Sequence, residues 1–144
     1  MKIHLNKGID NLQFGMTRSE VKKIYGRQNR EIINPEDDNE LIWEYTDQKL
    51  RLTFYQNESD RLGYIRSSNP SLTIFDKKLI DHEIEEIKNR IDPRTDSWEK
   101  EENFSFTTFF HENDWLTLNV EYERITDIEL GVPFKTEDEY DWPK

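Results

Sequence analysis

Residues 12–26 carry the polar and apolar spacing of a short amphipathic helix with both ends marked. Its apolar stripe is formed by Val21, Ile24 and Tyr25. Thr17 and Glu20 have the spacing of a capping box, and Gly26 stands where a left-handed residue ends a helix. Because an isolated helix of about two to three turns is marginal in water, we expect it to lie on a sheet.

Three segments after this helix read as antiparallel strands, at residues 41–46, 49–55 and 61–66. The second is the clearest, because Leu50, Leu52 and Phe54 alternate with polar residues at the period of a half-buried strand. The polar stretch 27–40 before them reads as a surface loop.

The second half of the chain shows the same order of patterns. Residues 76–91 predict a helix with Asp76 as its N-cap, and its apolar stripe is formed by Ile80, Ile84, Ile87 and Ile91. Pro93 ends this helix, because the residue before a proline is pushed out of the helical region. Three further strands are predicted at residues 104–110, 115–122 and 124–130.

Together these patterns predict an α+β fold in which a helix followed by three antiparallel strands occurs twice. The two repeats cover about residues 1–70 and 71–132, and Leu50, Leu52 and Phe54 correspond to Leu116, Leu118 and Val120. An acidic tail, residues 133–144, completes a single domain. Each unit has one sheet face for its helix, so we expect two layers with the other sheet face open.

Composition agrees with a folded chain of 144 residues in spite of its polarity. Only 33% of the residues are hydrophobic and 35% are charged, but four Trp, six Tyr and eight Phe supply large buried areas. The absence of Cys excludes disulfides and thiolate chemistry. The first residues, MKIHLNKGID, contain no apolar run, so we expect no signal peptide and a cytoplasmic location.

The net charge of −11 lies entirely in the second half. Residues 1–72 hold equal numbers of basic and acidic side chains, whereas residues 73–144 hold 9 basic and 20 acidic ones. Such a surface repels a phosphate backbone and attracts a basic protein. The alternative is that the excess acid only keeps the protein soluble.

The alternation of the predicted strands indicates which side chains face away from the helix. If Leu116, Leu118 and Val120 face inward, the outward positions combine aromatic rings with carboxylates, as protein interfaces do. We expect the partner-binding residues to be Phe109, Trp115, Asn119, Glu121, Asp127 and Glu129. The alternative is that the tail or a second copy of the chain covers these aromatic side chains.

The sequence offers little that predicts catalysis. His4, His82 and His111 lack the spacing of metal ligands, and the abundant carboxylates fit a solvated surface better than an acid and base pair. Phosphate-binding, dinucleotide-binding and nucleophile-elbow motifs do not occur. We therefore expect a protein that is not an enzyme and has neither a metal nor a cofactor.

The run FGMTRSEVKKIYG, followed by L-x-L-x-F and R-L-x-x-I, resembles the helix and sheet unit of SmpA/OmlA outer-membrane assembly lipoproteins. In tandem, it is similar to the β-lactamase inhibitory proteins, in which two such units present a concave sheet to an enzyme. The chain lacks the lipidated Cys of the first family and the disulfides of the second. The resemblance implies a scaffold that holds protein partners, and a scaffold does not determine function.

Our first hypothesis is therefore a cytoplasmic immunity protein that neutralises a basic toxin, most simply a nuclease, by covering its active site. The second is a structural or assembly adaptor that forms a homodimer through the open sheet face. The third is a solvated domain whose tail folds over that face. Direct binding to nucleic acid or to a membrane is not expected.

Overall fold

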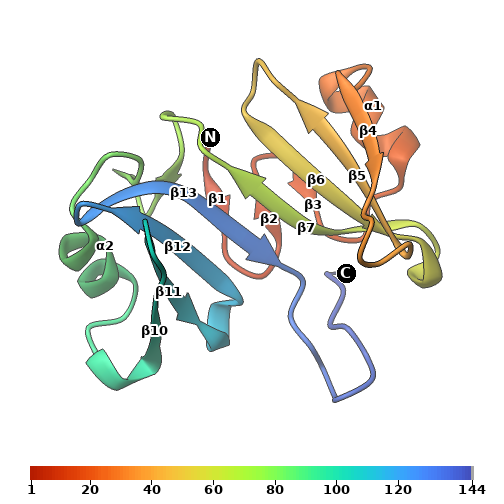
Figure 1. Cartoon of the computed structure of the whole chain (residues 1–144). Helices are drawn as coiled ribbons and strands as arrows, with labels where there is room; N and C mark the ends of the chain where they lie inside the picture. The colour runs from red at the N-terminus through yellow and green to blue at the C-terminus, as the bar shows by residue number, and fades with distance from the viewer. Residues whose placement is uncertain (144) are drawn as a thin grey trace.

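The computed structural model describes residues 1–143 and contains one eight-stranded antiparallel sheet (Figure 1). The strands of the first half are β4 (Arg30–Ile33), β5 (Glu40–Tyr45), β6 (Leu50–Tyr55) and β7 (Arg61–Ser67). Those of the second half are β10 (Trp98–Glu102), β11 (Thr107–His111), β12 (Leu116–Glu121) and β13 (Arg124–Gly131). Their order across the sheet is β10-β11-β12-β13-β7-β6-β5-β4, so β13 and β7 join the halves at its centre.

Two helices and two small sheets cover one face of the large sheet. The helices are α1 (Arg18–Tyr25) and α2 (Ile84–Ile91), which Figure 1 shows toward opposite ends of the molecule. The small sheets comprise β1 (Ile3–His4), β2 (Gly8–Ile9) and β3 (Leu12–Gln13), and β8 (Thr73–Ile74) and β9 (Lys77–Lys78). Their apolar side chains join those of the large sheet in one hydrophobic cluster.

The predicted first helix is confirmed with both of its ends. The Thr17 hydroxyl accepts from the Glu20 N–H at 3.3 Å, and the Glu20 carboxylate accepts from the Thr17 N–H at 3.2 Å. Gly26 ends the helix with a φ of 77° and donates to the Lys22 carbonyl. Val21 is fully buried and Tyr25 is partly buried, whereas Ile24 of the predicted stripe is exposed, so the helix packs on the sheet mainly through Val21.

The predicted fold class is wrong. The molecule is mostly β, with two helices of eight residues each in the described chain, and each helix is followed by four strands of the large sheet rather than three. Within the large sheet, the two strands that the sequence did not predict are its outermost ones, β4 and β10. The expected tandem unit of a helix and three strands is therefore absent from residues 1–143.

The predicted second helix begins eight residues too early. Phe75 and Asp76 have positive φ values of 49° and 65° and form the turn between β8 and β9. Asp81 also has a positive φ, of 63°, and α2 starts only at Ile84. The predicted helix thus included the end of a hairpin, and Ile80 of its apolar stripe lies in the turn between β9 and α2.

The inward and outward alternation of the central strands is confirmed. Leu50, Leu52 and Phe54 on β6 and Leu116, Leu118 and Val120 on β12 are all buried. Register shifts occur between Thr53 and Phe54 and between Asn119 and Val120, where β6 pairs with β7 and β12 pairs with β13. The opposite face of the sheet, which we call the open face, carries the polar residues between these apolar positions.

The C-terminal segment, residues 132–143, docks against one end of the open face through aromatic rings. Tyr140 stacks on Tyr55 of β6 and on Phe134, with ring centroids 5.4 and 4.6 Å apart. Trp142 contacts Tyr140 at 5.6 Å, and the Arg61 guanidinium lies 5.1 Å from its ring. This docking agrees with the third sequence hypothesis, while Lys144 of the predicted tail lies outside the described residues.

Candidate functional site

The six predicted partner-binding residues lie in three separate places. Asn119, Asp127 and Glu129 form a polar network on the open face. Trp115 lies under the docked C-terminal segment, and Phe109 and Glu121 line a groove beside α2. The six residues therefore do not form the single surface that the sequence predicted.

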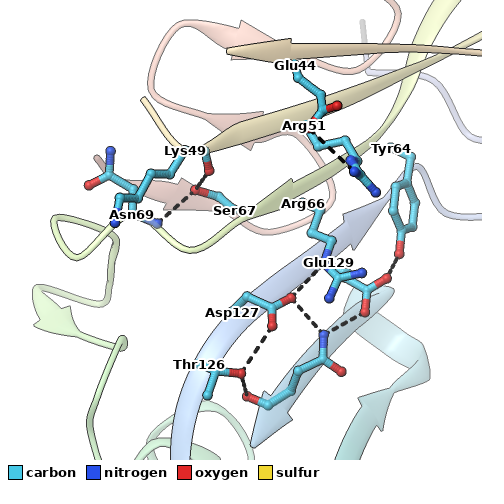
Figure 2. Close-up of polar contacts among 11 residues, drawn as sticks. Glu44, Lys49, Arg51, Tyr64, Arg66, Ser67, Asn69, Thr126, Asp127 and Glu129 are labelled. Atoms are coloured by element: carbon cyan, nitrogen blue, oxygen red, sulfur yellow. Dashed lines mark hydrogen bonds and ion pairs between the residues drawn. The ribbon is translucent and has the colours of Figure 1, made fainter. Parts of the chain in front are cut away.

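The open-face network links the two halves of the sheet (Figure 2). The Asn119 amide donates to Asp127 at 2.9 Å and to Glu129 at 2.7 Å. Arg66 of β7 donates to Asp127 at 2.8 Å, and the Tyr64 hydroxyl donates to Glu129. These carboxylates are thus hydrogen-bonded within the chain, and their first role is to join β12, β13 and β7.

Burial raises the pKa of Glu129. Desolvation raises the pKa of its carboxyl above the usual value, because the charged form has lost water. Replacing such a group by Lys would place a second cation beside Arg66 and break both hydrogen bonds, so Glu129 is a poor candidate for a removable contact residue.

A cavity of about 590 Å³ lies beside this network, across β5, β6, β7 and β13. Its charged side chains are Glu44, Lys49, Arg51, Arg66 and Asp127. Arg51 approaches Glu44 to 3.4 Å, and Arg66 is paired with Asp127, so neighbouring charges largely offset one another (Figure 2). The open face therefore presents paired charges of both signs and no strongly acidic surface.

Trp115 occupies a turn rather than a strand. It follows the 3-10 turn of residues 112–114 with a φ of 48°, and β12 begins one residue later. Its ring meets Phe110 and Phe134 edge to face, with centroids 5.2 and 5.3 Å apart. A Cβ on Gly131 would lie 2.3 Å from this ring, so glycine leaves the space that the indole fills.

Phe109 faces the core, which corrects the prediction that it faces outward. It pairs with Leu118 across the ladder, and Thr107 pairs with Val120, so both residues share the face of the inward apolar residues. Phe109 is 6% exposed. The sequence prediction assigned the wrong register to β11, and this error reversed the face of every side chain on the strand.

The groove that Phe109 and Glu121 share combines exposed aromatic and acidic side chains. It has a volume of about 410 Å³ and lies between the start of α2, the loop of residues 103–106 and the turn between β12 and β13. Three exposed aromatic side chains line it, namely Phe104, Phe106 and Tyr122. Four exposed carboxylates line it as well, those of Glu83, Glu85, Glu121 and Glu123. We call this site the acidic groove.

The two lysines beside the Phe109 ring are each paired with a carboxylate. Lys88 is buried, with its ammonium 4.5 Å from the Phe109 ring centroid and 3.5 Å from Glu85. Lys100 lies 5.8 Å from the same ring and 3.1 Å from Glu102. The two ammonium groups therefore support the buried ring, and the rim of the groove keeps an excess of negative charge.

A buried charged cluster holds the outer part of the sheet behind this groove. The Asp92 carboxylate lies 2.9 Å from Nε2 of His111 and accepts from Arg94 at 2.8 and 3.0 Å. Nδ1 of His111 lies 2.9 Å from Asp114, and the Trp98 indole donates to the Asp92 carbonyl at 3.1 Å. The hydrogen bonds from Arg94 and His111 hold the pKa of Asp92 well below its ordinary range.

This cluster connects the end of α2 with β10 and β11, so its geometry indicates a structural role. His111 and Asp92 are 3% and 7% exposed and offer no open position to a substrate. Within residues 1–143, no group of three or more potential His or carboxylate ligands is arranged to hold a metal ion. No helix in that part of the chain is long and apolar enough to span a membrane.

The groove aromatic residues were missed in the sequence because predicted strands included them. Phe104 and Phe106 were assigned to a strand, but β11 begins at Thr107, and Tyr122 lies in the turn after β12 with a φ of 50°. A signal was present: Asn103 and Ser105 next to these rings favour a turn, where large side chains are readily exposed.

Comparison with known proteins supports the fold and no more. No protein-family model and no curated protein matches this sequence. A solved structure of an extracellular protein containing an SCP domain from Bacillus anthracis resembles it with a TM-score of 0.56 and 9% sequence identity. The match covers 81% of this chain and 43% of that protein, so the chain spans less than half of the larger molecule.

Proposed function

We propose that this protein is a non-enzymatic binding module that captures a basic protein in its acidic groove. The observation that carries the proposal is the combination of three exposed aromatic side chains and four exposed carboxylates around one cavity. Exposed aromatic clusters of this kind are typical of interfaces, because their burial by a partner removes apolar surface from water. A surrounding rim of one charge selects partners of the opposite charge.

The distribution of charge over the chain supports the same partner chemistry. The whole net charge of −11 resides in the second half, and the acidic groove is built from that half alone. Long-range attraction would speed the encounter with a basic surface, and the aromatic contacts would slow dissociation.

An immunity protein that covers the active site of a cytoplasmic toxin fits this proposal best. A nuclease, for example, has a basic cleft that receives phosphates, and the carboxylates of Glu121 and Glu123 could occupy the same cleft. The homodimeric adaptor has less support, because the open face is filled by internal ion pairs and the docked C-terminal segment.

Selection from a random peptide library displayed on phage tests the proposal without knowledge of the partner. We expect the immobilised protein to enrich peptides that combine Lys or Arg with aromatic or aliphatic residues. The double substitution Glu121→Lys and Glu123→Lys should weaken their binding at least about tenfold, since it reverses the charge of two exposed side chains that line the groove.

The matched control is the double substitution Glu36→Lys and Asp38→Lys. It makes the same change in net charge, but on an exposed loop of the first half that is remote from the groove in the sheet order. Binding should persist in this control. Enrichment of neutral or acidic peptides, or an equal loss in both double variants, would refute the proposed function.

A further inference from the structure

The edge strand β10 runs directly beside the acidic groove and has a free side. Its other side pairs with β11 without a register shift, from Trp98 opposite His111 to Glu102 opposite Thr107. The Asn103 N–H donates to the Phe106 carbonyl at 2.8 Å, which continues the same register by one residue. In residues 1–143, no further strand pairs with β10.

This register determines which backbone groups of β10 are free. In an antiparallel pair, alternate residues direct their N–H and C=O groups toward the partner strand and away from it. Since Asn103 bonds toward β11, Glu101 and Glu99 do the same, and Lys100 and Glu102 direct their backbone groups outward. The edge thus offers donors and acceptors to an added strand.

The groove and the edge form one continuous surface. Lys100 and Asn103 at the end of β10 also line the acidic groove, next to Phe104. Four residues of β10 are exposed, and three of them are Glu: Glu99, Glu101 and Glu102. A strand added at this edge would therefore lie among carboxylates. The residues that follow this strand in the partner would contact the exposed aromatic rings of the groove.

We infer that a basic, extended segment of the partner protein adds to β10 as an additional strand and continues into the acidic groove. This inference rests on the proposed function and specifies how the partner is held. Main-chain hydrogen bonds to Lys100 and Glu102 supply the pairing, and alternate side chains of the added strand supply specificity. Lys or Arg residues of that strand oppose Glu99, Glu101 and Glu102.

Charge complementarity selects a basic segment over a second copy of this chain. An antiparallel pair of β10 strands centred on Lys100 would place Glu99 against Glu101 and the two Lys100 side chains against each other. Like charges directly opposite one another destabilise a strand pair. The other sheet edge, β4, has one Arg, one Glu and two Ile residues, so it lacks this charge preference.

A pair of synthetic peptides tests the inference. The first peptide alternates Lys and Val over about ten residues, and the second is its twin with every other backbone nitrogen methylated along one edge. Methylation leaves the charge and the side chains unchanged but removes the donors that strand pairing needs. By titration calorimetry at low salt, we expect the methylated twin to bind at least about tenfold more weakly.

Two substitutions at one position test the protein side of the pairing. Lys100→Pro removes the outward N–H of β10 without removing a bond to β11, and proline is tolerated at such edge positions. Lys100→Ala removes the same ammonium group but keeps the N–H. We expect the Lys100→Ala variant to bind the Lys-Val peptide as well as the unsubstituted protein does. The Lys100→Pro variant should bind this peptide at least about tenfold more weakly.

Each remaining outcome has a definite meaning. Equal binding of both peptides would overturn strand addition but leave the proposed function standing, whereas binding of neither peptide would refute both. A homodimer that Lys100→Pro dissociates would assign the edge to a second copy and overturn the inference. If the Lys100→Pro variant fails to fold, the affinities of the two peptides for the unsubstituted protein still show whether strand addition occurs.

Discussion

At the scale of single residues, Asp92 and Glu129 show how opposite surroundings move two carboxyl groups in opposite directions. Asp92 has Arg94 and His111 as hydrogen-bonding neighbours, which favour its charged form and lower its pKa. For Glu129, desolvation is the largest influence on the carboxyl, and it raises the pKa even though the carboxylate accepts two hydrogen bonds. The two groups therefore give stability opposite dependences on pH.

Asp92→Asn should destabilise the protein at neutral pH. The folded pKa lies below the unfolded value of 3.8, so the stabilisation by Asp92 is present above about pH 4 and is lost as the pH falls. In urea unfolding, the variant should have a lower midpoint than the unsubstituted protein at pH 7. The difference between the two midpoints should become smaller below pH 4. A gap that is the same at all pH values would contradict this assignment.

Glu129→Gln should show the reverse dependence. The folded pKa lies above the unfolded value of 4.5, so protonation favours the folded state and this stabilisation is lost as the pH rises. Relative to the unsubstituted protein, the Gln variant should gain stability between about pH 4 and pH 7 in the same urea experiment. A steady relative loss over that interval would show that hydrogen bonding, and not burial, dominates at Glu129.

Single positions also explain why the six predicted site residues lie in three separate places in the structure. Asn119, Asp127 and Glu129 were placed on the correct face, since residues 116–119 of β12 pair with residues 127–130 of β13 in one register and the register shift falls just beyond them. Trp115 was assigned to a strand because it precedes an alternating run. Its left-handed conformation depends on a remote residue, Gly131, whose missing side chain makes room for the indole, and no local pattern shows this contact.

At the scale of elements, α1 begins and ends where its local signals predict, so its cap can be tested directly. Thr17→Ala should lower the free energy of unfolding by about 1 kcal/mol, because it removes the hydroxyl that accepts from Glu20. Thr17→Ser keeps that hydroxyl and should lose much less in urea unfolding at pH 7. Equal losses in the two variants would show that the methyl group, rather than the cap, is responsible.

The strands that could be predicted are those that bury one face. β5, β6, β7, β12 and β13 alternate buried and more exposed residues, and each was recognised within one or two residues at its ends. β4 and β10 lie at the sheet edges, where little is buried, so their sequences REII and WEKEE carry no period of two. The missed edge β10 is the one to which we assign the partner.

At the scale of the whole molecule, the C-terminal segment completes the end of the open face. Deleting residues 133–144 would remove Phe134, Tyr140 and Trp142 and leave the rings of Tyr55 and Trp115 uncovered. We expect the truncated protein to bind the dye ANS more strongly, to melt at a lower temperature and to aggregate.

The control for this truncation is the full chain with Glu137→Ala and Asp138→Ala. Both residues are exposed on the same segment, and neither contributes to the aromatic stacking. This variant should behave as the unsubstituted protein does. If truncation leaves dye binding and melting unchanged, the segment does not cover the face in solution.

The charge asymmetry of the chain is the whole-molecule property that the sequence revealed most directly. Its location on the surface could not be predicted from the sequence, because the acidic residues of the groove come from the start of α2, the end of β12 and the turn after it. The carboxylates expected on the open face are instead hydrogen-bonded to Arg66, Asn119 and Tyr64. Only the folded chain shows which acid remains free for a partner.

The most direct test of our account is an NMR titration of the isotope-labelled protein with the Lys-Val peptide. The account predicts that the largest amide shifts fall on β10, on the loop of residues 103–106 and on the turn between β12 and β13. Shifts confined to the open face, around Arg51, Arg66 and Asp127, would place the binding surface on the wrong side of the sheet and contradict it.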